Sequence, residues 1–128
     1  MIILDSYTAL RTDITTFLKT ITANVYSVDS DEEVAYPYLT YDLTEVQSLT
    51  EDGDTLLMEV DGWDQGDSTS AILTIMANVD NGLNRRTIIN SDIAVTYYRD
   101  QREQLKETDK RIKHFRYTYL VRLSEVEV

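Results

Sequence analysis

The chain of 128 residues lacks several features on which common functions depend. It has no cysteine, which excludes disulfides and thiolate chemistry and is compatible with a reducing compartment. None of its four glycines is spaced as in a phosphate-binding loop. No apolar run approaches the roughly 20 residues of a membrane span, and the start, MIILDSYT, lacks the basic residues of a secretory signal. We therefore expect one globular α+β domain spanning residues 1–128.

Positive charge is missing from half of the chain. No Lys or Arg occurs between Thr20 and Asn84, where fourteen Asp and Glu are found, whereas residues 85–128 carry ten basic and seven acidic side chains. The net charge of −11 disfavours a protein that grips nucleic acid by neutralising phosphates. Complementary acidic and basic parts favour head-to-tail contacts between copies. A solvated acidic face that maintains solubility remains open as the simpler interpretation.

The centre of the chain predicts a β-hairpin followed by a helix. Residues 38–43 and 55–63 alternate between polar and apolar side chains, as half-buried strands do. Between them, Glu51-Asp52-Gly53-Asp54 predicts a tight two-residue turn. Residues 67–70 offer N-cap oxygens, and apolar residues recur from Ile72 to Leu83 at helical spacing. Asn81-Gly82 predicts a left-handed residue that ends this helix.

The remaining segments complete an expected order of α-β-β-β-α-β-β. Residues 5–21 predict an amphipathic helix, residues 24–28 a short strand, and residues 92–98 and 113–125 two further strands. Residues 84–87 are expected to begin a loop. The polar segment 99–111 is interpreted as either a solvated helix or a mobile loop. The predicted fold is therefore a mostly antiparallel sheet with two helices packed on one face.

Candidate chemistry is sparse. Asp61, Asp64 and Asp67 are spaced by three residues and could bind magnesium or manganese if they converged, although helix capping is the simpler expectation. The acidic run from Asp29 to Glu33 lacks a calcium-loop pattern. His114 is the only histidine and has no nucleophile motif to accompany it, so we expect it at the surface or an interface. No enzyme, cofactor or metal site is predicted.

Four short motifs carry a resemblance to a known family. They are Tyr36-Pro37-Tyr38-Leu39, Val60-Asp61-Gly62-Trp63, the helix stripe Ile72…Met76…Val79…Leu83, and His114-Phe115-Arg116-Tyr117. Together with the order of elements, they make the chain resemble the tail terminator or tail-to-head joining proteins of long-tailed phages, most of all the branch from phages and prophages of Gram-positive bacteria. The resemblance covers nearly the whole chain, while 99–111 falls in a variable part.

The resemblance implies a structural virion protein made in the host cytoplasm. Copies of it would form a ring, usually of six, that caps the tail tube. The ring would join the tube protein to the head connector or stopper protein, and DNA would pass through without specific binding. We hypothesise that an acidic lumen repels that DNA. The side chains that we expect in contacts with partners are Asp61, Trp63, Asp64, Arg85, Arg86, Arg99, Arg102, Lys106, Lys110 and Arg111.

Two other classes remain open. The first is an acidic inhibitor that mimics DNA and occupies a nucleic-acid-binding protein, for which the long stretch without a basic residue is the argument. The second is a small metal-dependent enzyme built on Asp61, Asp64 and Asp67.

Overall fold

The computed structural model describes residues 6–27, 34–49, 53–89 and 93–125. Along the chain these residues form α1 (Ser6–Ile21), β1 (Val25–Ser27), β2 (Tyr38–Leu49), β3 (Gly53–Gln65), α2 (Ser70–Leu83), β4 (Thr87–Ile89), β5 (Ile93–Leu105) and β6 (Ile112–Glu125). The predicted order is confirmed, with β4 added where a loop was expected. Neither described helix has the length and hydrophobicity needed to cross a membrane.

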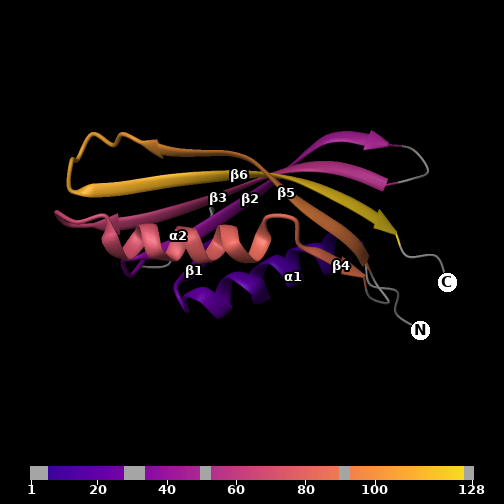
Figure 1. Cartoon of the computed structure of the whole chain (residues 1–128), viewed down its shortest axis with the longest axis horizontal. Helices are drawn as coiled ribbons and strands as arrows, with labels where there is room; N and C mark the ends of the chain where they lie inside the picture. The colour runs from indigo at the N-terminus through magenta and orange to yellow at the C-terminus, as the bar shows by residue number, and fades with distance from the viewer. Residues whose placement is uncertain (1–5, 28–33, 50–52, 90–92, 126–128) are drawn as a thin grey trace.

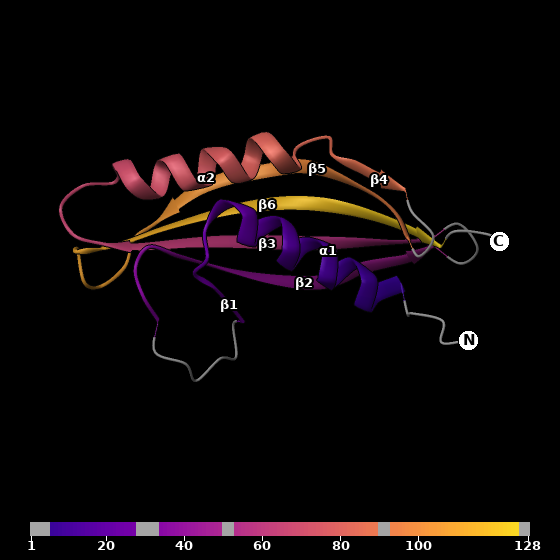
Figure 2. The same ribbon diagram turned by 90° about the horizontal axis from the view of Figure 1, so that it is seen from below.

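The described strands form one mixed, strongly curled sheet in the order β1-β2-β3-β6-β5-β4. Only β1 pairs in parallel with its neighbour, and the other pairs are antiparallel. Both helices lie below the sheet in Figure 1 and in front of it in Figure 2. Met76 of α2 approaches Gly62 of β3, and Thr15 of α1 bonds the Tyr41 hydroxyl of β2, so the two helices contact the same face. We call this the helix face and the opposite one the open face.

The core follows from the two periodicities in the sequence. Leu10, Ile14 and Leu18 of α1 are fully buried, as are the predicted α2 residues Ile72, Met76 and Val79. They pack on alternate strand residues, among them Leu39, Met58, Val60, Tyr97, Tyr119 and Val121. One shared core therefore joins the sheet to both helices.

The C-terminal end of α2 differs from the prediction, whereas an oxygen from the expected residues 67–70 does bind an amide at its start. At the start, the Ser68 hydroxyl accepts a hydrogen bond from the Ser70 amide at 3.1 Å, while the Thr69 side chain makes no capping bond. At the end, the helix continues through Gly82 to Leu83, and the left-handed residue is Arg85, with φ of 66°. Gly82 is needed for packing instead, because a Cβ at this position would collide with the Phe17 ring of α1.

The interpretation of 99–111 as a helix or mobile loop is wrong for residues 99–105. β5 continues to Leu105, and only residues 106–111 connect it to β6. A long partner strand supplies the backbone hydrogen bonds, pairing Leu105 with His114, and a bulge between Arg99 and Gln101 preserves the pairing.

Two predicted features lie outside the described residues, in whole or in part. The acidic run from Asp29 to Glu33 is not described. Of the Glu51–Asp54 turn, Gly53 and Asp54 belong to β3, where Gly53 pairs with Leu49. Gly53, which was expected at the centre of the turn, therefore belongs to the strand, and Glu51 and Asp52 lie outside the described ranges.

Buried tyrosine hydroxyls fasten both helices to the sheet. Tyr97 of β5 donates to Asp13 of α1 at 2.8 Å, and Tyr119 of β6 donates to Asp80 of α2 at 2.9 Å. Burial, followed by the neighbouring carboxylate, raises the pKa of both tyrosines, so the hydroxyls keep their protons. Each aspartate also binds an arginine: Arg86 lies 3.3 Å from Asp13, and Arg99 lies 2.7 Å from Asp80.

The fit of Phe17 against Gly82 can be tested by Gly82→Ala. We expect this change to lower the free energy of unfolding by about 1–3 kcal/mol. The cost of forcing the new methyl group against the Phe17 ring should exceed the gain of about 1 kcal/mol that alanine brings to a helix. Asn81→Ala, at an exposed neighbouring position, is the matched control for propensity. Urea titrations would measure both variants. Equal or greater stability of Gly82→Ala would show that the contact does not constrain the helix pair.

The tyrosine bonds can be tested by Tyr119→Phe. Removing the hydroxyl leaves one oxygen of buried Asp80 without its donor, so we expect a loss of about 1–2 kcal/mol in unfolding free energy. Tyr98→Phe, at a side chain that is 45% exposed, should change stability little. Similar losses in the two variants would contradict a specific role for the Tyr119–Asp80 bond.

Candidate interaction site on the open face

Strand register decides which side chains reach the open face. Asp61 pairs with Arg116 and Trp63 with His114 across β3 and β6. Tyr38 and Thr40 of β2 lie opposite Trp63 and Asp61. Since paired residues share a face, these side chains form a continuous surface. No helix among the described elements lies over it (Figure 1).

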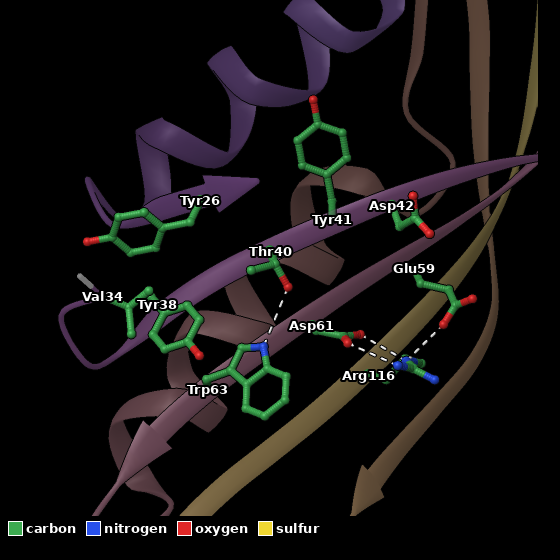
Figure 3. Close-up of a pocket in the computed structure, with 10 residues that line it drawn as sticks. All are labelled: Tyr26, Val34, Tyr38, Thr40, Tyr41, Asp42, Glu59, Asp61, Trp63 and Arg116. Atoms are coloured by element: carbon green, nitrogen blue, oxygen red, sulfur yellow. Dashed lines mark hydrogen bonds and ion pairs between the residues drawn. The ribbon is translucent and has the colours of Figure 1, made fainter. Parts of the chain in front are cut away.

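Arg116 joins two carboxylates of β3. Its Nε lies 2.9 Å from Asp61 Oδ1, and its Nη2 lies 3.1 Å from Asp61 Oδ2. The same Nε is 2.9 Å from Glu59 Oε2. Figure 3 shows these three contacts side by side on neighbouring strands. A guanidinium can bind a carboxylate through two parallel bonds, so this pair fixes the geometry as well as the charge.

His114 is held between two further carboxylate contacts and is only 3% exposed. Its Nδ1 lies 2.7 Å from Glu107 Oε1, and its Nε2 lies 3.0 Å from Asp61 Oδ2. The second contact is a charge contact rather than an aligned hydrogen bond. Burial opposes the charged ring, but Asp61 and Glu107 together outweigh it and raise the pKa of His114 above its ordinary value. Of the two expected positions, the surface is therefore wrong, because the side chain of Glu107 from the β5–β6 connection and the ring of Trp63 meet this ring, and an interface stays a prediction.

Aromatic rings line the same region. Trp63 stacks on His114 with ring centres 3.6 Å apart, and Tyr38 lies parallel to Trp63 at 6.0 Å. Tyr26 and Tyr36 contact Tyr38 at 5.6 and 5.3 Å. A row of rings thus runs from β1 to β6 and separates the buried histidine from the outer part of the face.

A hollow of about 290 Å³ opens beside this row. Its walls include Tyr26, Tyr38 and Trp63, and its acidic groups are Asp42, Glu59 and Asp61 (Figure 3). Among the described residues that line it, Arg116 is the one cation. We call this hollow the acidic aromatic pocket. Its chemistry suits a cation, because carboxylates supply charge and ring faces attract positive groups.

The predicted aspartates do not converge. Asp61 lies on the open face, whereas Asp64, three residues along the strand, lies on the helix face, is 9% exposed, and accepts the Gln65 amide. Asp67 is exposed in the β3–α2 connection. Among the described residues, no group of three His, Asp or Glu side chains is placed to hold a metal ion.

The predicted basic residues fall into two groups. Arg86 and Arg99 bind Asp13 and Asp80, and the Arg85 amide donates to the Tyr97 carbonyl, so this group fastens α1 and α2 to β5. The other group is exposed near the end of the β5–β6 hairpin and consists of Arg102, Lys106, Lys110 and Arg111. Within the described part of the chain, none of these four side chains forms an ion pair, although Arg102 lies over the Tyr117 ring at 5.9 Å.

Sequence reasoning missed four residues of the cluster: Glu59, Glu107, His114 and Arg116. Alternation along residues 113–125 placed His114 and Arg116 on one face, and alternation along residues 55–63 placed Glu59 with Asp61. The sequence did not show the register in which β3 pairs with β6, nor that the β5–β6 connection places Glu107 beside His114.

The fold thus belongs to the α+β class, with two helices on one face of a curled mixed sheet. A solved chain of similar fold belongs to a "Virion of native gene transfer agent (GTA) particle". The two share 13% sequence identity with a TM-score of 0.66, and the match covers 94% of this chain and 92% of that one. At this identity the likeness concerns the fold. No family model matches this sequence, and no curated protein sequence matches it.

The raised pKa of His114 makes stability depend on pH. The charged His114 ring contributes fully to the folding stability below the pKa of histidine in the unfolded chain, which is about 6.5. This stabilisation is lost as the pH rises through the higher pKa of His114 in the folded protein. We therefore expect the melting temperature to fall as the pH is raised from about 6 to about 9, and to change less in His114→Phe. Thermal melts followed by circular dichroism would measure this.

Because His114 is the only histidine, its imidazole signals in NMR titrations report one group. Glu107→Gln should bring its pKa down toward the ordinary value. Glu103→Gln is the control, since Glu103 lies on the same hairpin and Glu107, not Glu103, contacts the ring. A His114 pKa at or below about 6.5 in the unaltered protein would contradict the assignment of a charged ring.

Proposed function

We propose that this chain is a structural protein of a phage-like virion that caps the end of the tail tube as a ring and joins the tail to the head connector. The observation that carries the proposal is the fold shared with a virion chain over nearly the full length of both proteins. The four sequence motifs described above resemble tail terminator proteins and supply the finer assignment. The protein would act in the assembled virion after synthesis in the host cytoplasm.

The distribution of charge across the sheet supports a ring. β2 and β3 contain no basic residue, and they lie on the β1 side of the sheet. The exposed cations Arg102, Lys106, Lys110 and Arg111 lie on β5 and on the β5–β6 connection, which adjoins the end of β3 at Gly66. A closed ring requires two different complementary surfaces on each copy. Acidic strands and a separate basic hairpin end on one chain could supply two such surfaces.

Apolar side chains on the open face add a second contribution. Leu57, Leu120 and Tyr98 are paired across β3, β6 and β5, and Leu120 and Tyr98 are 36% and 45% exposed. Contact with a neighbouring copy, the tube protein or the connector would remove this row from water.

The acidic residues that face the lumen would repel the DNA that passes through.

The main alternative, an inhibitor that mimics DNA, is less well supported. Such a mimic needs free carboxylates spaced like phosphates. Glu59 and Asp61 are instead bound to Arg116, and Asp61 also contacts His114. Part of the acidic stretch is therefore neutralised within the chain.

The proposal is tested by deleting this chain from the phage or prophage that carries it. We expect electron microscopy to show filled heads apart from tails, or tails of uncontrolled length, because the tube would lack its cap. Supplying the unaltered chain from a plasmid should restore joined particles. A variant with Lys106, Lys110 and Arg111 changed to Gln should restore fewer of them, while Lys19→Gln on α1 serves as the charge control. Normal joined particles without the chain would overturn the proposal.

A further inference from the structure

The acidic aromatic pocket has more negative charge than its own cation satisfies. Arg116 is bound by Asp61 and Glu59, and no other basic side chain lines the pocket in the part of the chain that the structure describes. Asp42 is exposed at its edge, and in the described structure its carboxylate has no hydrogen bond or ion pair. A further positive group would therefore gain charge contacts there without displacing Arg116.

The walls of the pocket favour a particular kind of cation. Tyr26, Tyr38 and Trp63 present aromatic surface beside the carboxylates. Arginine and lysine side chains combine an apolar stem with a charged end, so they can use both parts of such a lining. A hydrated metal ion would make no use of the rings.

The same chain offers unpaired cations in a fixed position. The β5–β6 connection carries Lys106, Lys110 and Arg111, all exposed. Two contacts hold the connection to its own sheet: Glu107 binds His114, and the Arg111 carbonyl accepts the Gly66 amide at 2.8 Å. A cationic surface held in this way loses little freedom when it binds.

We propose that the acidic aromatic pocket of one copy receives a basic side chain, Lys110 or Arg111, from the β5–β6 connection of a second copy. This inference rests on the proposed ring, and it identifies the surfaces that meet. The contact is heterologous, since it joins β1–β3 of one copy to the β5–β6 end of the next. It would also give Asp42 the ion pair that it lacks among the described residues.

Cysteine cross-linking can test the contact directly, because the natural chain has no cysteine. Asp42→Cys and Lys110→Cys would be made in separate chains that carry different tags, and both would be supplied to assembling particles. Any disulfide between the two tags must join different copies. We expect a product carrying both tags in assembled particles, roughly tenfold above that from Asp42→Cys mixed with Ala77→Cys, whose cysteine lies on the exposed side of α2.

The outcomes separate this inference from the proposed function. Joined particles that depend on the chain but yield no Asp42–Lys110 product would overturn the inference and leave the ring in place. A disulfide product formed only between two Asp42→Cys copies would also overturn it, because the same surface would then meet itself across a two-fold axis instead of meeting the β5–β6 connection. Particles that assemble without the chain would instead remove the proposed function.

Trp63 provides a second measurement in the purified protein. It is the only tryptophan of the chain and lines the pocket, so its fluorescence reports occupancy. We expect the Trp63 emission to change as the protein concentration rises, and added salt to suppress that change. In Asp42→Asn, and in the double variant Lys110→Gln with Arg111→Gln, the protein concentration needed for the same change should be about ten times higher. Thr74→Ala, at an exposed position on α2, should behave like the unaltered chain. A dependence that survives removal of either charge would contradict the proposed contact.

Discussion

The antiparallel pairing of β3 with β6 is the constraint on which the rest of the structure depends. It runs from Asp54 opposite Leu123 to Gln65 opposite Ile112, through the middle of the sheet. Val60 and Tyr117 are paired on the helix face, while Asp61 and Arg116 are paired next to them on the open face. A slip of one residue would exchange the two faces of a strand and place charged groups against α2.

The helix face holds the fold together through a combination of apolar and polar contacts. Burial of the α1 and α2 stripes supplies the non-directional attraction, and the Tyr97–Asp13 and Tyr119–Asp80 bonds add direction. Arg86 and Arg99 neutralise the two aspartates. Part of the basic half of the sequence is thus used inside the molecule, so the charge available to partners is not simply the charge of the sequence.

The open face differs because no described helix covers it and its charged groups are only partly paired. Arg116 and His114 bind Glu59, Asp61 and Glu107 and leave one negative charge in excess, whereas Asp42 and the cations of the β5–β6 connection form no ion pair among the described residues. An assembly in which acidic and basic surfaces alternate would pair these groups, and the proposed ring is such an assembly.

The sequence by itself determined the helices, the main strands and the division of charge. These features are local: periods of two and of 3.6 set the buried sides of β3, β6, α1 and α2, and the missing Lys and Arg between Thr20 and Asn84 can be read directly. Only the tertiary structure decided that Gly82 accommodates Phe17 and that 99–105 is a strand, because each depends on a distant partner. It also decided that His114 is buried between Asp61 and Glu107. A hydrogen-bonded register and a close packing contact join residues far apart in the chain, and no local pattern specifies them.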